Sequence, residues 1–136
     1  MTKLTRAVLV LTFAVASVGG RADAWTCRND IEVQCGPKAC SVSKGGEFTP
    51  MNVSFDSNGT FSVCAYSGCW EGKGKAVWNE PFLVISQKQV DWSDPNRRID
   101  GREDILIAFS STDRLALVKA GGFVLPMHCT KEAEAR

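Results

Sequence analysis

The 136-residue sequence has one histidine, His128, a formal net charge of only +1, and little helical periodicity. A single histidine leaves few options for acid–base catalysis or for a zinc site, because both commonly rely on imidazole. The near-neutral charge argues against the basic surface on which nucleic-acid binding depends. We therefore expect neither a nucleic-acid partner nor a metal or other cofactor.

Long apolar runs are also absent, although the N-terminus resembles a secretory signal peptide. Lys3 and Arg6 precede an apolar segment at residues 7–18, and Ala22-Asp23-Ala24 supplies the small residues that signal peptidase reads. The apolar segment is shorter than the about 20 residues that a transmembrane helix needs. We predict that residues 1–24 are a cleaved signal peptide, and that the protein is periplasmic or secreted with no integral membrane segment.

The remaining chain is short enough to form a single domain. Residues 25–130 are too few to build two separate hydrophobic cores, so we expect one compact unit. Residues 131–136 are mostly charged and are predicted to be a frayed tail.

Six cysteines follow the predicted cleavage site: Cys27, Cys35, Cys40, Cys64, Cys69 and Cys129. An even number of cysteines in an oxidising compartment indicates disulfides. Gly-Pro and Ser-Gly are turn residues inside the two short cysteine spacings, so Cys35 can fold back to Cys40 and Cys64 to Cys69. The remaining two cysteines then pair across the whole domain. Of the pairings that six cysteines permit, this one is favoured.

Short alternating segments separated by turn residues predict strands throughout the mature chain. The clearest is a hairpin in which residues 51–55 and 61–65 flank the turn Asp56-Ser57-Asn58-Gly59, because Asn-Gly is the strongest short hairpin signal. Further strands are expected at 31–35, 39–42, 75–78, 82–86, 89–92, 105–110, 114–119 and 123–129.

This pattern predicts an all-β fold, a small antiparallel up-and-down barrel or sandwich of about eight short strands stapled by disulfides. Pairing of Cys27 with Cys129 favours closure, because the first and last strands would then be neighbours. Residues 83–85 and 106–109 are apolar at consecutive positions. Such strands are buried on both faces, or turn one face toward a cavity or a partner.

Two stretches are candidates for contacting a partner. Residues 69–75 combine an aromatic with lysines and glycines, and residues 92–104 combine an aromatic with arginines, which interface centres favour. The candidate partner-binding residues are Trp70, Lys73, Lys75, Trp92, Arg97, Arg98 and Arg102. We interpret the first stretch as a loop in which Gly72 and Gly74 relieve strain or cradle an anion.

Other chemistry is less well supported by the residues present. The acidic residues Asp91, Asp94, Asp100, Glu103 and Asp104 do not match a calcium loop, because arginines intervene and the required glycine is misplaced. His128 is interpreted as a strand residue beside a disulfide, since no free thiol is expected to accompany it.

Three classes of function remain. We predict a non-enzymatic, inhibitor-like binding protein that contacts a macromolecular partner, another secreted or periplasmic protein, through surface loops. The alternative is a calycin-like carrier of a small apolar ligand, whose cavity would be lined by the inward residues of 83–85 and 105–109. A small hydrolase is disfavoured because no nucleophile, base and oxyanion set is evident.

Overall fold

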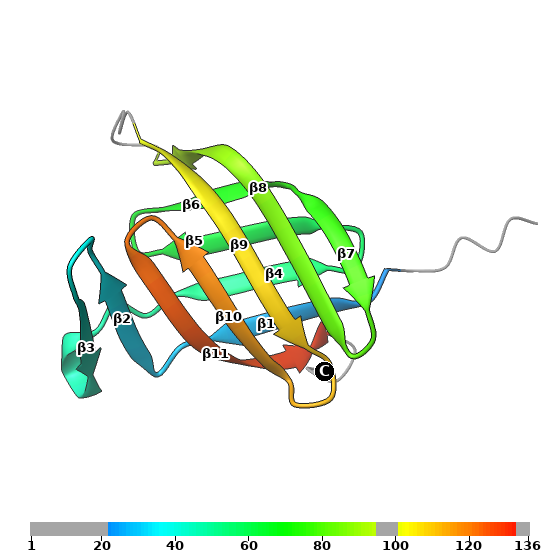
Figure 1. Cartoon of the computed structure of the whole chain (residues 1–136), viewed down its shortest axis with the longest axis horizontal. Coiled ribbons are helices and arrows are strands. Elements are labelled where there is room, and N and C mark those ends of the chain that lie inside the picture. Colours follow the sequence, from blue (N-terminus) through cyan, green and yellow to red (C-terminus); the bar gives the residue numbers. More distant parts are fainter. Residues whose placement is uncertain (1–21, 95–100, 133–136) are drawn as a thin grey trace, which may run out of the picture.

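A computed structural model describes residues 22–94 and 101–132, and these residues fold into one antiparallel sheet that closes into a barrel (Figure 1). The predicted signal peptide lies largely outside the described residues, as do Arg97, Arg98, Asp100 and the end of the tail. The elements are β1 (Ala24–Arg28), β2 (Ile31–Cys35), β3 (Cys40–Lys44), the 3₁₀ turn η1 (Gly45–Glu47), β4 (Asn52–Asp56), β5 (Thr60–Ala65), β6 (Gly68–Lys73), β7 (Lys75–Asn79), β8 (Phe82–Ser93), β9 (Arg102–Ser110), β10 (Leu115–Ala120) and β11 (Phe123–Lys131). No helix of the described residues is long and apolar enough to cross a membrane.

Eight of the described strands make the barrel, in the order β1-β4-β5-β6-β8-β9-β10-β11, and β11 pairs with β1 to close it. Strands β8 to β11 cross in front of β1, β4, β5 and β6 in Figure 1. The predicted all-β antiparallel fold is therefore confirmed, and of the two predicted architectures the structure has the up-and-down barrel and not the sandwich. Strands β2 and β3 form a hairpin outside the barrel, which lies between β1 and β4 in sequence.

All three predicted disulfides are confirmed, and each one joins residues directly opposite each other on neighbouring antiparallel strands. Cys27–Cys129 links β1 to β11 at the seam where the barrel closes. Cys35–Cys40 and Cys64–Cys69 each staple the end of a hairpin. These covalent links are compatible with an oxidising extracellular or periplasmic environment.

Alternation of apolar and polar residues places one face of each strand in a filled interior. In the predicted hairpin, Val53, Phe55, Phe61 and Val63 point inward and are at most 3% exposed. The turn is held by Asp56, whose carboxylate accepts hydrogen bonds from the Asn58 and Thr60 N–H groups at 2.8 and 3.1 Å. The hairpin and its inward set are as predicted.

The strands predicted at 82–86 and 89–92 are one continuous strand, β8. A bulge interrupts the alternation of inward and outward residues along it. Pairing with β9 shifts register between Gln87 and Val90, and Gln89 has a positive φ of 56°. The extra residue shifts the inward-facing side chains from odd-numbered to even-numbered positions. In the sequence this shift looks like the end of one strand and the start of another. The Gln89 N–H donates to the Asp104 carboxylate at 3.0 Å, and this bond is the main reason that the pKa of Asp104 lies below its ordinary value.

The glycine-rich stretch predicted as a loop is instead strand β6 leading directly into β7. At Gly74 a β-carbon would lie 2.7 Å from the Ser86 carbonyl oxygen, and at Gly72 it would meet the Gln87 side chain. Gly74 is therefore required by the close approach of the β8 backbone, whereas the flexible Gln87 side chain can move aside at Gly72. The loop interpretation of this stretch is wrong, because both of its halves are strands, and the anion cradle stays a prediction.

One end of the barrel is closed by aromatic side chains. The Trp25 ring packs on Phe55, Phe109 and Trp78, with ring centroids 4.9 to 6.1 Å apart. We call this the closed end. The other end, between the β5–β6 and β10–β11 turns, is more open and holds the candidate site.

Candidate binding site at the open end of the barrel

The open end contains a small, mainly apolar pocket of about 290 Å³. Its lining comes from five strands and the segments beside them: Thr49, Met51, Ala65, Ser67, Trp70, Trp92, Gly101, Glu103 and Phe123. We call it the mouth pocket. Because its walls come from distant parts of the chain, only closure of the barrel brings them together.

On the side of the mouth pocket where β6 pairs with β8, the wall consists of two indole rings. Trp70 and Trp92 are directly opposite each other in register, and their ring centroids are 4.3 Å apart at a steep angle. Neither indole N–H has a hydrogen-bond partner within the described part of the chain, although both nitrogens are buried. Trp70 itself is only 9% exposed, so it shapes the pocket rather than the outer surface.

Glu103 contributes the only ionisable side chain among the residues lining the mouth pocket. It lies on β9 opposite Val90, which is an inward-facing position, and it is half-buried. A carboxylate beside tryptophan, methionine and phenylalanine suits the binding of a side chain with an apolar stem and a cationic tip.

The rim of the mouth pocket is made rigid by disulfides. The β5–β6 turn carries Tyr66, which is 81% exposed, and Cys64–Cys69 closes this hairpin immediately behind it. On the other side, the Cys35 N–H donates to the Gly122 carbonyl at 2.8 Å, which ties the β2–β3 hairpin to the β10–β11 turn. These turns lie together at the left of Figure 1.

The predicted partner-binding residues divide into three groups. Trp70 and Trp92 meet at the mouth pocket, and Arg102 lies next to it, paired with the Asp91 carboxylate at 2.9 Å on an exposed surface. Lys73 and Lys75 lie on the outside of the barrel, away from the pocket lining. Arg97 and Arg98 lie outside the described residues.

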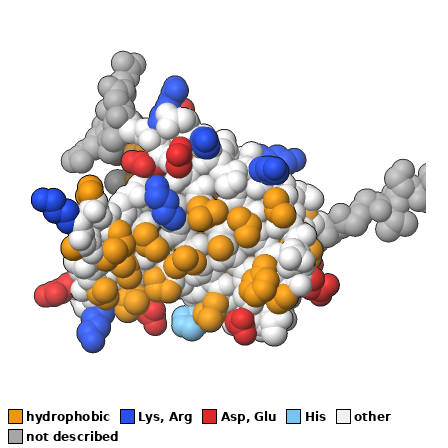
Figure 2. Space-filling view, viewed as in Figure 1, with side chains coloured by type: hydrophobic (Ala, Val, Ile, Leu, Met, Phe, Trp, Pro, Cys, Tyr) orange, Lys and Arg blue, Asp and Glu red, His pale blue; other side chains and the backbone are white. Residues whose placement is uncertain are grey.

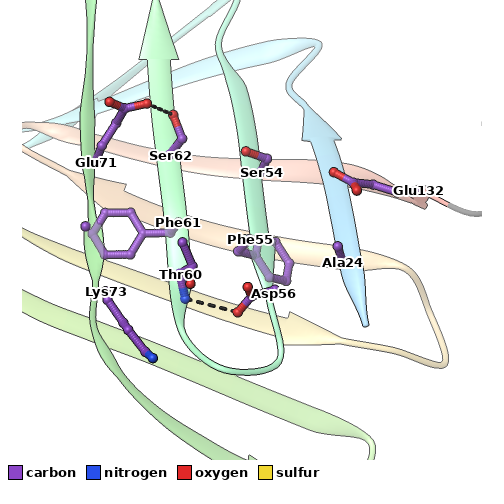
Figure 3. A pocket seen from close by; sticks show the side chains of 11 residues that line it. Ala24, Ser54, Phe55, Asp56, Thr60, Phe61, Ser62, Glu71, Lys73 and Glu132 are labelled. Atoms are coloured by element: carbon purple, nitrogen blue, oxygen red, sulfur yellow. Dashed lines mark hydrogen bonds between the residues drawn. The ribbon is translucent and has the colours of Figure 1, made fainter. Parts of the chain in front are cut away.

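Lys73 borders a wide, open groove of about 720 Å³ on the outer face of β1, β4, β5 and β6. Figure 3 shows its polar floor, where the Ser62 hydroxyl donates to the Glu71 carboxylate at 3.1 Å. Asp56 and Glu132 also border it, so acidic and hydroxyl groups lie beside the apolar Phe55 and Phe61 in the groove. Its shallow, open form provides no enclosed site for a reaction.

Residues that the sequence did not single out contribute to the mouth pocket. Met51 and Phe123, which line the pocket, were expected only as core or strand positions. Tyr66 does not line the pocket but lies on the turn between Ala65 and Ser67, which do, and it was treated as part of a turn between cysteines. Tyr66 did carry a signal, because a large aromatic inside a disulfide-closed turn has little chance of burial. Phe123 carried none, since it follows Gly121-Gly122 like any residue that begins a strand.

The remaining chemical candidates are separated in space. His128 is an exposed residue on the outside of β11, opposite Leu115, in agreement with its interpretation as a strand residue. Within residues 22–94 and 101–132, no group of three or more His, Cys, Asp or Glu side chains is arranged to hold a metal ion.

Comparison of the chain with protein-family models, with curated proteins and with solved structures found no match.

Proposed function

We propose that this is a non-enzymatic, inhibitor-like binding protein of the periplasm or the extracellular space, and that it contacts another protein through its open end. The observation that supports this most directly is the mouth pocket set between disulfide-stapled turns, with Tyr66 projecting beside it. The predicted signal peptide agrees with such a location.

The filled interior favours a protein partner over a carried ligand. Leu83, Ile85, Ile107 and Phe109 are the inward residues that a calycin-like cavity would need, and each is at most 2% exposed within one packed core. A carried apolar ligand would have to sit outside this core, and the mouth pocket at the open end is the candidate place. At about 290 Å³ this pocket is at or below the usual size range of small-molecule sites, about 300 to 1,000 Å³.

A pocket of this volume fits one long side chain from a partner. Trp70, Trp92 and Met51 supply apolar surface for the stem, and Glu103 supplies a negative charge for the tip. We propose that the partner inserts a lysine or arginine here, since tryptophan attracts cations as well as apolar groups. Tyr66 then contacts the surface around the inserted residue.

Rigid turns make this arrangement effective for binding. Ordering flexible loops costs about 0.5 to 1.5 kcal/mol for each immobilised side chain, and the two hairpin disulfides remove part of that cost in advance. Exposed aromatic anchors on rigid loops are typical of surfaces that bind proteins tightly.

The first experiment uses native mass spectrometry of the exported protein purified from its own host. We expect a kilodalton-scale companion with the wild type, loss of that companion with Tyr66→Ala and Glu103→Gln, and its retention with Thr112→Ala, an exposed change at the closed end. The mass of the protein also tests cleavage after Ala24. A companion that all three variants retain would contradict a role for the open end.

A second experiment tests the pocket without a known partner, using N-butylguanidine and 1-pentanol as cationic and neutral probes followed by tryptophan fluorescence. We expect millimolar binding of the cation, weakened roughly 5-fold or more by Glu103→Gln, with little change for the alcohol. An adduct of a few hundred daltons in the native spectrum, lost on denaturation, would favour the carrier alternative.

A further inference from the structure

A second surface, on the outside of strands β7 to β11, is apolar and exposed. Its large apolar side chains are Val77, Phe82, Val84, Leu106, Leu115 and Leu117, which are each 38 to 55% exposed. We call it the apolar outer face. Figure 2 shows hydrophobic side chains spread over this side of the molecule, where Figure 1 draws β8, β9 and β10 in front.

The strand registers arrange this face in three parallel rows. The central row is Val77, Val84, Ala108, Leu117 and Pro126. The row toward the open end is Lys75, Ser86, Leu106, Lys119 and Val124. The row toward the closed end is Asn79, Phe82, Ser110, Leu115 and His128.

The size of the face is that of a protein interface. From the exposed fractions, its six main side chains present on the order of 500 Å² of apolar surface, near the top of what soluble monomers expose in one patch. A specific interface buries about 800 Å² on each partner. The remaining small and polar residues of the three rows can supply the difference.

We propose that the occupant of the apolar outer face is a second copy of this chain, related by a two-fold axis that lies along the central row. This operation places the open-end row of one copy over the closed-end row of the other, strand on like strand. Each apolar residue of the central row meets its own copy at the axis, where two sheets can approach to about 10 Å.

Side-chain sizes on the two outer rows are complementary under this operation at strands β8 and β9. On β8, the large Phe82 of one copy lies over the small Ser86 of the other. On β9, Leu106 of one copy lies over Ser110 of the other. On β8 and β9 each large residue thus meets a small one, whereas on β10 Leu115 of one copy lies over Lys119 of the other. The size match on these two central strands favours a second copy over an unrelated partner.

Charges at the edge of the face agree with the same axis. Lys75 is exposed at the open-end row of β7, and Glu80 is exposed just beyond the closed-end row of the same strand. The two-fold axis brings the lysine of one copy toward the glutamate of the other, twice in each dimer. The mouth pocket is at the end of the barrel and stays accessible, so dimerisation and partner binding are independent.

The test is sedimentation velocity of the purified protein, produced from the full chain, from about 1 to 200 µM. We expect a dimer, with the dissociation constant raised about 100-fold or more by Leu117→Lys at the centre of the face. Val42→Lys is the control, because Val42 is 62% exposed on β3, outside the face. Leu117→Ser provides a milder variant if the lysine lowers the melting temperature.

A charge exchange tests the orientation of the axis. Lys75→Glu and Glu80→Lys should each weaken the dimer several-fold, and the double variant should recover most of the loss. A monomer at every concentration overturns the proposal, as does a dimer that Leu117→Lys leaves intact or that Val42→Lys disrupts. Failure of the charge exchange to recover affinity overturns the proposed axis. None of these outcomes bears on the open end.

Discussion

At the scale of single residues, Asn29 and Glu32, the polar residues that are buried among those the structure describes, hold the segment that leaves the barrel. Asn29 is 8% exposed and makes three hydrogen bonds, donating to the carbonyls of Ile31 and Thr49 and accepting from the Met51 N–H at 2.7 Å. Glu32 accepts from the Thr49 N–H at 2.8 Å. These bonds pair backbone groups of Ile31, Thr49 and Met51, where the chain leaves the barrel and returns to it, and they position Met51 in the mouth pocket.

Replacement of Asn29 by alanine therefore leaves buried backbone groups without partners. We expect Asn29→Ala to lower the free energy of unfolding by about 2 to 4 kcal/mol, measured by urea denaturation at neutral pH. Asn52→Ala is the matched control, because Asn52 is exposed at the start of β4, and it should change stability by less than about 0.5 kcal/mol. Similar losses in the two variants would mean that the Asn29 bonds are not important.

At the scale of elements, the strand pairs β6–β8 and β7–β8 depend on glycines that lack a side chain to collide. Gly74 donates its N–H to the Gly59 carbonyl at 2.9 Å and lies against the β8 backbone. The sequence shows glycines alternating with lysines, which is typical of a loop, but it does not show which strand passes alongside. For this reason β6 was not predicted.

Adding a single methyl group at Gly74 tests how tightly this glycine packs against the β8 backbone. Because the nearest atom to an added β-carbon is a backbone oxygen, which cannot rotate away, we expect Gly74→Ala to lower the free energy of unfolding by about 2 kcal/mol or more. Gly46→Ala is the control, since nothing lies within 4 Å of a β-carbon there. Circular dichroism melts of both variants measure the difference, and equal melting temperatures would show that β8 moves to accommodate the methyl.

At the scale of the whole molecule, the barrel is closed both by hydrogen bonds and by one long-range covalent link. Cys27 and Cys129 are separated by 102 residues in sequence, whereas Cys35 and Cys40 are separated by only 5. A bridge over the longer loop restricts the unfolded chain much more. The seam disulfide is therefore expected to be the main covalent contribution to stability.

Removal of each bridge separates these contributions. In the chain-entropy account, Cys27→Ala with Cys129→Ala lowers the free energy of unfolding by about 4 to 5 kcal/mol, against about 2 kcal/mol for Cys35→Ala with Cys40→Ala. Equilibrium unfolding in urea under non-reducing conditions measures both. An equal effect of the two double variants would indicate that strain or packing at the seam, rather than loop length, decides the outcome.

The sequence by itself determined the class of fold, the disulfide pairing and the inward face of the β4–β5 hairpin. Each of these follows from local chemistry: alternation with period two, turn residues between cysteines, and Asn58-Gly59 at a tight turn. Closure was only favoured over a sandwich, because pairing of Cys27 with Cys129 would make the first and last strands neighbours, and the structure decided for the closed barrel.

Only the tertiary structure decided which of the candidate residues meet. Trp70 and Trp92 are joined because β6 pairs with β8, and Phe123 and Met51 join them because the barrel closes. The apolar outer face has the same origin, since Val84 and Leu117 lie in one row only through the registers of three strands. Period-two patterns show that a residue faces in or out, but register between strands is a long-range property, and it decides which outward residues become neighbours.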